Sequence, residues 1–296
     1  MSDQTRISYI VLAHKNIRQI EQLLRAIEAE NVTIYLHIDN NAGNELFEKA
    51  RQRLTNINRL RFLRCVTSTW GSFGLVRATL EGIHQIVQEN DFDYVNLISG
   101  QDYPIQSKAS IRQFFSENRG RSFLENYPLP IAFWTDDGGF DRINHWYFPK
   151  PKSKTMLARR YRNLKIRFVN KIAPNRRFPK GFIPYGGSQW WCLYKDCIEY
   201  IDEFTRNNLK FVKFFQHVRI PDELFFQTIL MNSPLRESII NQTLTYVDWK
   251  SGPLFPRVLD QSDLSKLNNS GCLYARKFDI DLDNQIFSII NQNLLR

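Results

Sequence analysis

The amino-acid sequence predicts an α/β protein with a mostly parallel central sheet flanked by helices. Over residues 7–98, short β-branched apolar runs alternate with segments whose apolar residues recur every three or four positions. Hydrophobic residues make up 43% of the 296 residues, enough for a substantial core, which excludes wholesale disorder. Alternation of this kind is typical of parallel strands joined by helices that cover both faces of the sheet.

The predicted elements follow one another in a regular order. The strands are Ile7–Ala13, Val32–Ile38, Leu60–Val66, Tyr94–Ile98 and, at the end of the series, Ser122–Glu125. The helices between them are Asn16–Glu30, Gly43–Thr55 and Leu75–Glu89.

The regular alternation ends after Glu125. Residues 126–148 are aromatic and loop-like, with two prolines and a Gly-Gly pair, and Pro174–Pro184 is predicted as a second loop. A strand is predicted over Trp190–Leu193, and helices over Thr155–Val169, Asp196–Thr205, Asp222–Met231, Asp260–Asn268 and Asp283–Leu294. Because no repeat or flexible linker interrupts the chain, residues 1–296 are predicted to form a single domain.

The positive charge of the chain is concentrated in one segment. Fourteen basic residues lie between Arg142 and Lys195 without a single Asp or Glu, which leaves 26 of the 40 basic residues against 30 acidic ones elsewhere. The segment 142–195 is therefore the candidate for binding phosphates, nucleic acid or an anionic glycan. The alternative is a solvated amphipathic face, which is the usual fate of a run of charges.

Other features exclude several classes of protein. The sequence contains no run of about eighteen apolar residues, so it predicts no membrane span. Residues 1–6 do not resemble a signal peptide. We therefore expect a cytoplasmic location, with peripheral contact at the inner membrane surface as a further expectation. The four cysteines lack CxxC spacing and are predicted to be buried free thiols.

Polar or small residues follow four of the predicted strands. They are His14-Lys15-Asn16, Asp39-Asn40-Asn41, Trp70-Gly71-Ser72 and Ser99-Gly100-Gln101-Asp102. Parallel sheets bind ligands outside the carboxyl ends of their strands, so these residues are candidates for a binding site. Loops are polar in any case, and Asn16 could simply cap its helix.

Pro221-Asp222-Glu223 places two acids at the predicted start of a helix. Favourable interaction with the helix dipole explains most such sequences. Glu223 is also a candidate catalytic carboxylate, since Leu224, Phe225 and Phe226 could supply a partly dry wall.

No metal site is predicted. The Asp-x-Asp pairs lie before a strand (Asp91 and Asp93) or in an acidic tail (Asp279, Asp281 and Asp283), and the histidines lack paired metal spacing. If a diphosphate is bound, cationic side chains are expected to balance its charge.

Seven motifs of the chain occur in a recognisable order. They are Ile10–Asn16, Tyr35–Asp39, Trp70–Thr79, Leu97–Pro104, Gly187–Trp191, Pro221–Glu223 and Ala275–Asp279. Together they resemble the core-2/I-branching family (glycosyltransferase family 14), which groups β-1,6-N-acetylglucosaminyltransferases with peptide O-xylosyltransferases. The resemblance extends from Ile7 to about Asp283.

The resemblance implies a GT-A-type fold and an inverting transfer of N-acetylglucosamine or xylose from a UDP-sugar, without a metal or other cofactor. Asp39 would contact the uridine, Lys277 the diphosphate, and Arg257 would be a second cation there. Glu223 would be the general base that deprotonates the acceptor hydroxyl. Residues 1–125 would form the donor-binding half and residues 126–296 the acceptor-binding and catalytic half. In contrast to the animal members, we expect no N-terminal membrane anchor, and the four cysteines are fewer than their disulfide-forming set.

The acceptor side is predicted from the same comparison. Glu125 is expected to bind acceptor hydroxyls, and Trp190 and Trp249 to offer apolar faces to a sugar ring, with core packing as the alternative for both tryptophans. The acceptor would be a glycan, glycolipid or peptide, and the basic segment 142–195 suggests that it is anionic. The alternative function is a non-catalytic protein that binds nucleic acid or an anionic polysaccharide through this segment.

Overall fold

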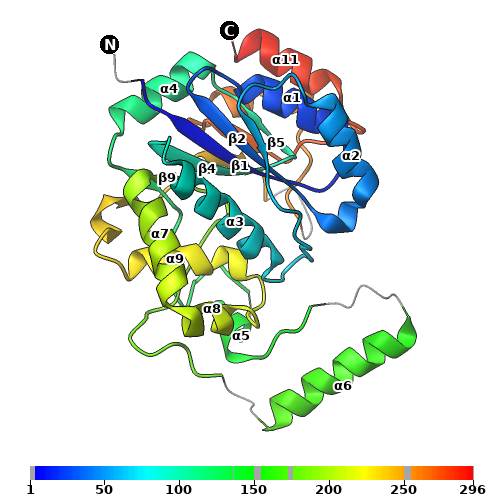
Figure 1. Ribbon diagram of the computed structural model, residues 1–296, viewed down its shortest axis with the longest axis vertical. Helices are drawn as coiled ribbons and strands as arrows, with labels where there is room; N and C mark the ends of the chain where they lie inside the picture. The colour runs from blue at the N-terminus through cyan, green and yellow to red at the C-terminus, as the bar shows by residue number, and fades with distance from the viewer. Residues whose placement is uncertain (1–3, 136, 150–154, 173–175, 250–254, 296) are drawn as a thin grey trace.

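The computed structural model describes residues 4–135, 137–149, 155–172, 176–249 and 255–295, and its centre is a seven-stranded sheet (Figure 1). From edge to edge the strands are β10 (Ile239–Ile240), β6 (Ser122–Phe123), β9 (Cys192–Tyr194), β4 (Tyr94–Ser99), β1 (Ile7–Ala13), β2 (Val32–Ile38) and β3 (Leu60–Phe62). Strands β4, β1, β2 and β3 pair in parallel, and β9 runs antiparallel to β4 and β6. The predicted α/β class with a mostly parallel sheet is confirmed.

Two hydrophobic cores lie on the two faces of this sheet. Tyr9 and Val11 of β1 point into one core, and Ile10 and Leu12 point into the other, because successive side chains of a strand alternate. The first core packs α1 (Ile17–Ile27), α2 (Asn44–Arg53), α4 (Lys108–Glu117) and α11 (Gln285–Asn293) against the sheet. The second packs α3 (Gly74–Glu89), α7 (Lys195–Asn207), α8 (Leu209–Phe215) and α9 (Phe225–Met231), as Figure 1 shows.

A smaller sheet lies beside the main one and was not predicted from the sequence. It consists of β11 (Thr245–Val247), β12 (Tyr274–Arg276) and β5 (Asp102–Pro104). Strand β12 pairs antiparallel with β5, which places Arg276 opposite Asp102. A two-stranded pair, β7 (Tyr127–Pro128) and β8 (Tyr185–Gly186), and the short helix α5 (Phe140–Asn144) lie in segments predicted as loop or left unassigned.

Several predicted elements are shorter or divided. The helix predicted over Asp222–Met231 is wrong at its start: residues Pro221–Glu223 form a separate 3-10 turn, η2. Ile220, before the turn, has a left-handed backbone with φ of 53°, and Leu224, after it, has φ of −133°, so the turn cannot continue into α9. The helix predicted over Asp260–Asn268 likewise divides into η4 (Gln261–Asp263) and α10 (Leu264–Asn268), and β3 covers only the first half of its predicted strand.

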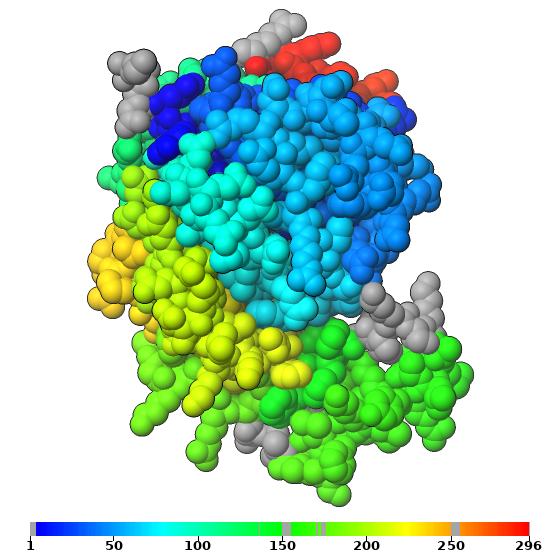
Figure 2. Space-filling model, in the orientation of Figure 1, coloured from blue at the N-terminus to red at the C-terminus, as the bar shows by residue number. Residues whose placement is uncertain are grey.

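Helix α6 (Met156–Ile172) confirms the helix predicted over Thr155–Val169 and stands apart from the body (Figure 1). In the space-filling view the green residues of α6 lie at the lower right of the visible face (Figure 2). Lys150, Lys152, Lys154 and Pro174 fall outside the described residues.

The four cysteines are free, as predicted. Cys192 and Cys197 are buried, whereas the predicted burial is wrong for Cys65 and Cys272, which are partly exposed. Within the described ranges, every helix is too short or too polar to cross a bilayer.

Candidate active site

The carboxyl ends of β1 and β2 place Asp39 beside His14. The backbone N–H of Asp39 donates to the carbonyl of Ala13 at 2.8 Å. Its carboxylate accepts hydrogen bonds from the backbone N–H groups of Asn41 (2.7 Å) and Ser68 (3.2 Å). These bonds hold the nearly buried carboxylate in one orientation at the edge of the sheet.

Three cations, Lys15, Arg276 and Lys277, gather next to this edge and are referred to here as the cation cluster. Burial lowers the pKa of Lys277, and the charges of Lys15 and Arg276 lower it further. The pKa of His14 falls by burial and through Lys15, Lys277 and Arg276, against an opposing effect of Asp39. Mutual repulsion of this kind favours a polyanionic ligand between the cations.

Contacts with acidic and aromatic side chains hold Lys15 and Arg276 in position. Lys15 Nζ lies 2.6 Å from Asp279 Oδ2. Arg276 Nε lies 3.4 Å from Asp102 Oδ1, and its guanidinium lies 4.1 Å from the centre of the Trp190 ring. Asp102 is fully buried and accepts from Ser99 through both the backbone N–H (2.9 Å) and the hydroxyl (2.7 Å). Burial raises the pKa of Asp102, whereas Arg276 lowers it.

Glu223 is held in the η2 turn by a cation from another element. Arg142 of α5 donates to Glu223 Oε2 at 2.6 Å, and the guanidinium lies 3.7 Å from the centre of the Trp134 ring. The side chain of Glu223 is 28% exposed, so its carboxylate is accessible and still oriented.

Gly187 joins the backbones of Glu223 and Glu125. The N–H of Gly187 donates to the carbonyl of Glu223 at 3.0 Å. A Cβ atom at position 187 would lie only 2.0 Å from the carbonyl oxygen of Glu125, so the close approach requires glycine.

The charge of Glu223 acts on two other carboxyl groups, Glu125 and Asp222, and the three are referred to here as the carboxylate cluster. Burial raises the pKa of Glu125, and the charge of Glu223 raises it further. The pKa of Asp222 rises to about 7, mainly by burial and then through Glu223, and its Oδ1 has no hydrogen-bond partner among the described residues. The charge of Glu223 also acts on Arg276, whose pKa burial lowers. Glu223 therefore lies within electrostatic range of Arg276, a member of the cation cluster.

The structure brings together most of the predicted site residues, but Arg257 lies in a network of its own. Its guanidinium bonds to Asp263 and lies 3.0 Å from Asp260 and 3.3 Å from Asp248. These carboxylates already satisfy the charge of Arg257, and no contact within the described ranges joins it to the cation cluster. Its predicted role as a second diphosphate cation therefore has no support from its contacts.

The two tryptophans differ in their surroundings. Trp190 is 9% exposed, belongs to the second core and has Arg276 over its ring, in agreement with the core-packing alternative. Trp249 is 59% exposed and keeps a face available to a ligand.

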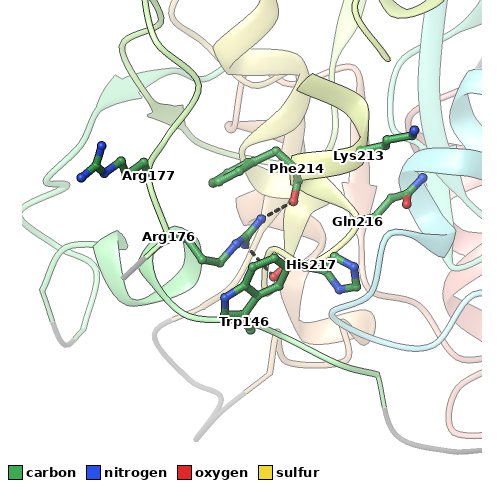
Figure 3. A pocket seen from close by; sticks show the side chains of 7 residues that line it. All are labelled: Trp146, Arg176, Arg177, Lys213, Phe214, Gln216 and His217. Carbon is green, nitrogen blue, oxygen red and sulfur yellow. Dashed lines mark hydrogen bonds between the residues drawn. The ribbon is translucent and has the colours of Figure 1, made fainter. Parts of the chain in front are cut away.

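The basic segment 142–195 does not form one surface. Arg142 pairs with Glu223, whereas Lys195 contacts Asn90 Oδ1 at 2.7 Å, next to the start of the sheet. Arg176 turns into a pocket beside Trp146 and donates to the backbone carbonyls of Phe214 and His217 (Figure 3). The other two cations that line this pocket, Arg177 and Lys213, point away from it (Figure 3). The described basic side chains of this segment are therefore distributed over separate regions, and its binding of an anionic partner stays a prediction.

In the part of the chain that the structure describes, no three His, Cys, Asp or Glu side chains converge as a metal site would require. Asp91 and Asp93 instead pair with Arg6, and Asp279 pairs with Lys15.

Sequence reasoning placed Lys15 and Asp102 among the binding-site candidates that follow strands but gave them no individual role, and it did not identify Arg142 or Arg276 as site residues. Arg276 lies inside the Ala275–Asp279 motif and Lys15 inside the Ile10–Asn16 motif, so the motifs contained a signal for both. For Arg142, the sequence contained no signal other than its position at the start of the acid-free segment 142–195.

The fold and the site define the class of protein: an α/β enzyme with a carboxylate and a cation cluster at the carboxyl edge of a mostly parallel sheet. The family model of the Core-2/I-Branching enzymes matches residues 7–268, and the chain belongs to this family. The resemblance seen in the sequence and the GT-A-type fold that it implies are confirmed.

Curated relatives agree with this assignment. Xylosyltransferase 2 of Canis lupus familiaris is 26% identical over 313 residues, which cover 98% of this chain and 34% of that protein. Xylosyltransferase 2 of Homo sapiens is 25% identical with the same coverage. Xylosyltransferase 1 of Canis lupus familiaris is 25% identical over 255 residues, which cover 84% of this chain and 25% of that protein. The chain thus spans a quarter to a third of the length of these relatives.

Proposed function

We propose that the protein is an inverting glycosyltransferase that moves a sugar from a UDP-sugar to an acceptor hydroxyl, with Glu223 as general base. The observation that carries the proposal is the position of Glu223: an accessible carboxylate, oriented by Arg142, whose charge acts on Arg276 of the cation cluster. Family membership and the names of the relatives support the same reaction class.

The geometry suits a direct displacement. Glu223 would take the proton of the acceptor hydroxyl as its oxygen attacks the anomeric carbon. The bond from that carbon to the diphosphate oxygen would break on the opposite side, and negative charge would develop on the departing UDP. Lys277 and Lys15 would stabilise this charge in the transition state, because they are placed before the reaction begins.

The donor and acceptor sides are assigned from the surrounding residues. Asp39, held at the end of β2, would contact the uridine, and Glu125 would bind hydroxyls of the acceptor. Trp249 is the more accessible of the two candidate stacking tryptophans. Of the two donor sugars considered, xylose is favoured because the relatives are named xylosyltransferases.

The test is hydrolysis and transfer with UDP-xylose and UDP-N-acetylglucosamine, measured for the wild type, Glu223→Gln and the control Glu237→Gln. Glu237 is a surface residue whose side chain is 84% exposed. We expect Glu223→Gln to lose a factor of about 10² to 10⁴ in kcat and Glu237→Gln to retain wild-type activity. Full activity of Glu223→Gln would remove Glu223 from the mechanism.

The metal requirement is tested in the same assay. We propose that turnover persists in EDTA, because the cation cluster can neutralise the diphosphate. Loss of turnover with the chelator, restored by Mg²⁺ or Mn²⁺, would overturn this part of the proposal. Contact with a membrane surface, which the basic segment also suggested, would involve α6 and not the side chains around Glu223.

A further inference from the structure

Helix α6 carries an apolar stripe that the rest of the chain leaves uncovered. The stripe consists of Leu157, Tyr161, Leu164, Phe168 and Ile172, and these side chains are between 55% and 78% exposed. Successive members are three or four positions apart, so at 3.6 residues per turn they share one face about 80° wide. Such a stripe on an ordinary surface helix would be turned toward the core.

Cations border the stripe on both sides. Arg160, Arg167 and Lys171 follow one edge, and Arg162 and Lys165 follow the other. Arg159 lies on the opposite face, and residues 156–172 contain no Asp or Glu. The helix therefore combines an exposed apolar face with uniform positive charge.

Only one edge of α6 contacts the body of the protein in the described ranges. Arg162 Nε donates to the carbonyl of Phe148 at 2.8 Å, and Lys165 Nζ lies 4.6 Å from the centre of the Phe148 ring. These contacts fix the rotation of the helix so that the stripe faces solvent, as the separate position of α6 in Figure 1 suggests.

We propose that α6 docks on an anionic lipid bilayer, with its apolar stripe among the acyl chains and its bordering cations at the phosphate level. An interfacial helix of this kind has a large apolar face, a cationic polar face and no acidic residues. The cations bind the negative surface, and the stripe adds affinity that a purely electrostatic contact lacks. This docking goes beyond the proposed transfer reaction and requires neither donor nor acceptor.

Charge distinguishes the bilayer from two other occupants. A nucleic acid would use the cations but leave five large apolar side chains in water. A second copy of α6 packed on the stripe would bring six cations against six of the same sign without a single intervening acid, which is unfavourable in a helix pair. A bilayer with anionic headgroups satisfies both features.

The test is co-sedimentation of the full chain with vesicles of phosphatidylcholine alone or mixed equally with phosphatidylglycerol. We expect binding to the mixed vesicles and at least tenfold weaker binding to pure phosphatidylcholine. The double variant Leu164→Glu/Phe168→Glu should bind the mixed vesicles at least tenfold more weakly than the wild type, because it removes two anchors and adds charge of the wrong sign. The matched control Leu209→Glu/Leu282→Glu changes two other exposed leucines, and it should bind as the wild type does.

Each remaining outcome is decisive. Unchanged circular dichroism and melting temperature of both double variants show that the substitutions act at the surface and not on folding. If the wild type binds heparin or RNA but not vesicles, and the stripe variant Leu164→Glu/Phe168→Glu keeps that binding, the proposal is overturned in favour of a polyanion site. If the wild type self-associates but does not bind vesicles, and the stripe variant no longer self-associates, the proposal is overturned and the stripe binds a second copy of the chain. Glu223→Gln should bind vesicles normally, so failure of the catalytic proposal leaves this result unaffected.

Discussion

Arg142 and Glu223 are 81 positions apart in the chain and form an ion pair of 2.6 Å. Arg142 comes from α5 and is stacked on Trp134, whereas Glu223 comes from the η2 turn. The pair joins two short elements that have little regular structure of their own. It gives the candidate base a defined direction, which a carboxylate on a short turn would otherwise lack.

Replacing Arg142 should therefore reduce catalysis more than stability. We expect Arg142→Met to lower kcat by roughly 10- to 100-fold, because the carboxylate of Glu223 loses its orientation. Arg142→Lys should recover part of this loss, since the charge is kept while the planar, stacked group is lost. Steady-state kinetics with the UDP-sugar that the wild type turns over would check this. Equal kcat and KM in Arg142→Met and the wild type would contradict a positioning role.

Asp222 should make stability depend on pH. Its folded-state pKa of about 7 lies above the ordinary value of 3.8, so the folded protein binds this proton more tightly than the unfolded chain does. Stability attributable to Asp222 is then present at low pH, is lost as pH rises from about 4 to about 7, and stays lost above that range.

The comparison variant is Asp222→Asn, which cannot ionise. We expect it to become progressively more stable than the wild type as pH increases, by up to about 4 kcal/mol in the free energy of unfolding. Melting temperatures of both proteins between about pH 5 and pH 8 would measure the difference. Parallel curves for the two proteins would show that Asp222 does not titrate in this range.

Asp102 should be essential for stability, because its buried carboxylate is the counter-ion of the Arg276 guanidinium. The side chain of Asp102 is fully buried and that of Arg276 is 15% exposed. Asp102→Asn would leave the guanidinium without its counter-ion, at an expected cost of about 3–5 kcal/mol in the free energy of unfolding.

A second substitution tests the cause of this loss. Asp102→Asn/Arg276→Met removes both charges and should be more stable than Asp102→Asn alone. Glu237→Gln breaks an exposed ion pair with Arg236 and should cost less than about 1 kcal/mol. Denaturant unfolding of Asp102→Asn, the double variant and Glu237→Gln gives these values. A double variant no more stable than Asp102→Asn alone would argue against coupling between Asp102 and Arg276.

Arg257 and Lys277 should behave as different kinds of residue. Arg257→Met removes a partner of the fully buried Asp263 and should lower stability by about 3 kcal/mol. Lys277 makes no side-chain hydrogen bond or ion pair with another described residue, so Lys277→Met should melt near the wild-type temperature. It should nevertheless lose a factor of about 10² in kcat/KM for the UDP-sugar.

Melting temperatures and donor kinetics of the two variants separate these roles. An Arg257→Met protein of normal stability that binds UDP poorly would restore Arg257 as the second diphosphate cation that the sequence suggested.

Local sequence patterns account for much of the fold. The apolar runs of β1, β2 and β4 and the amphipathic stripes of α1 and α3 predicted these elements close to their observed bounds. Hydrophobic periodicity is a short-range signal, so it can be recognised in the sequence wherever an element is long enough to contain several repeats of the pattern. The small sheet of β5, β11 and β12 was missed because each strand has only three residues and pairs with distant partners.

The same distinction applies to the site. Ordered motifs in the sequence singled out Asp39, Glu223 and Lys277, since residue identity and order can be read without coordinates. The partners of these residues could not be read in this way, because an ion pair such as Arg142 with Glu223 depends on where the chain returns in space. Antiparallel pairing of β12 with β5 brings Arg276 to Asp102, and an acidic network engages Arg257. The fold likewise divides the acid-free segment 142–195 among an arginine paired with Glu223, a buried arginine and the exposed helix α6.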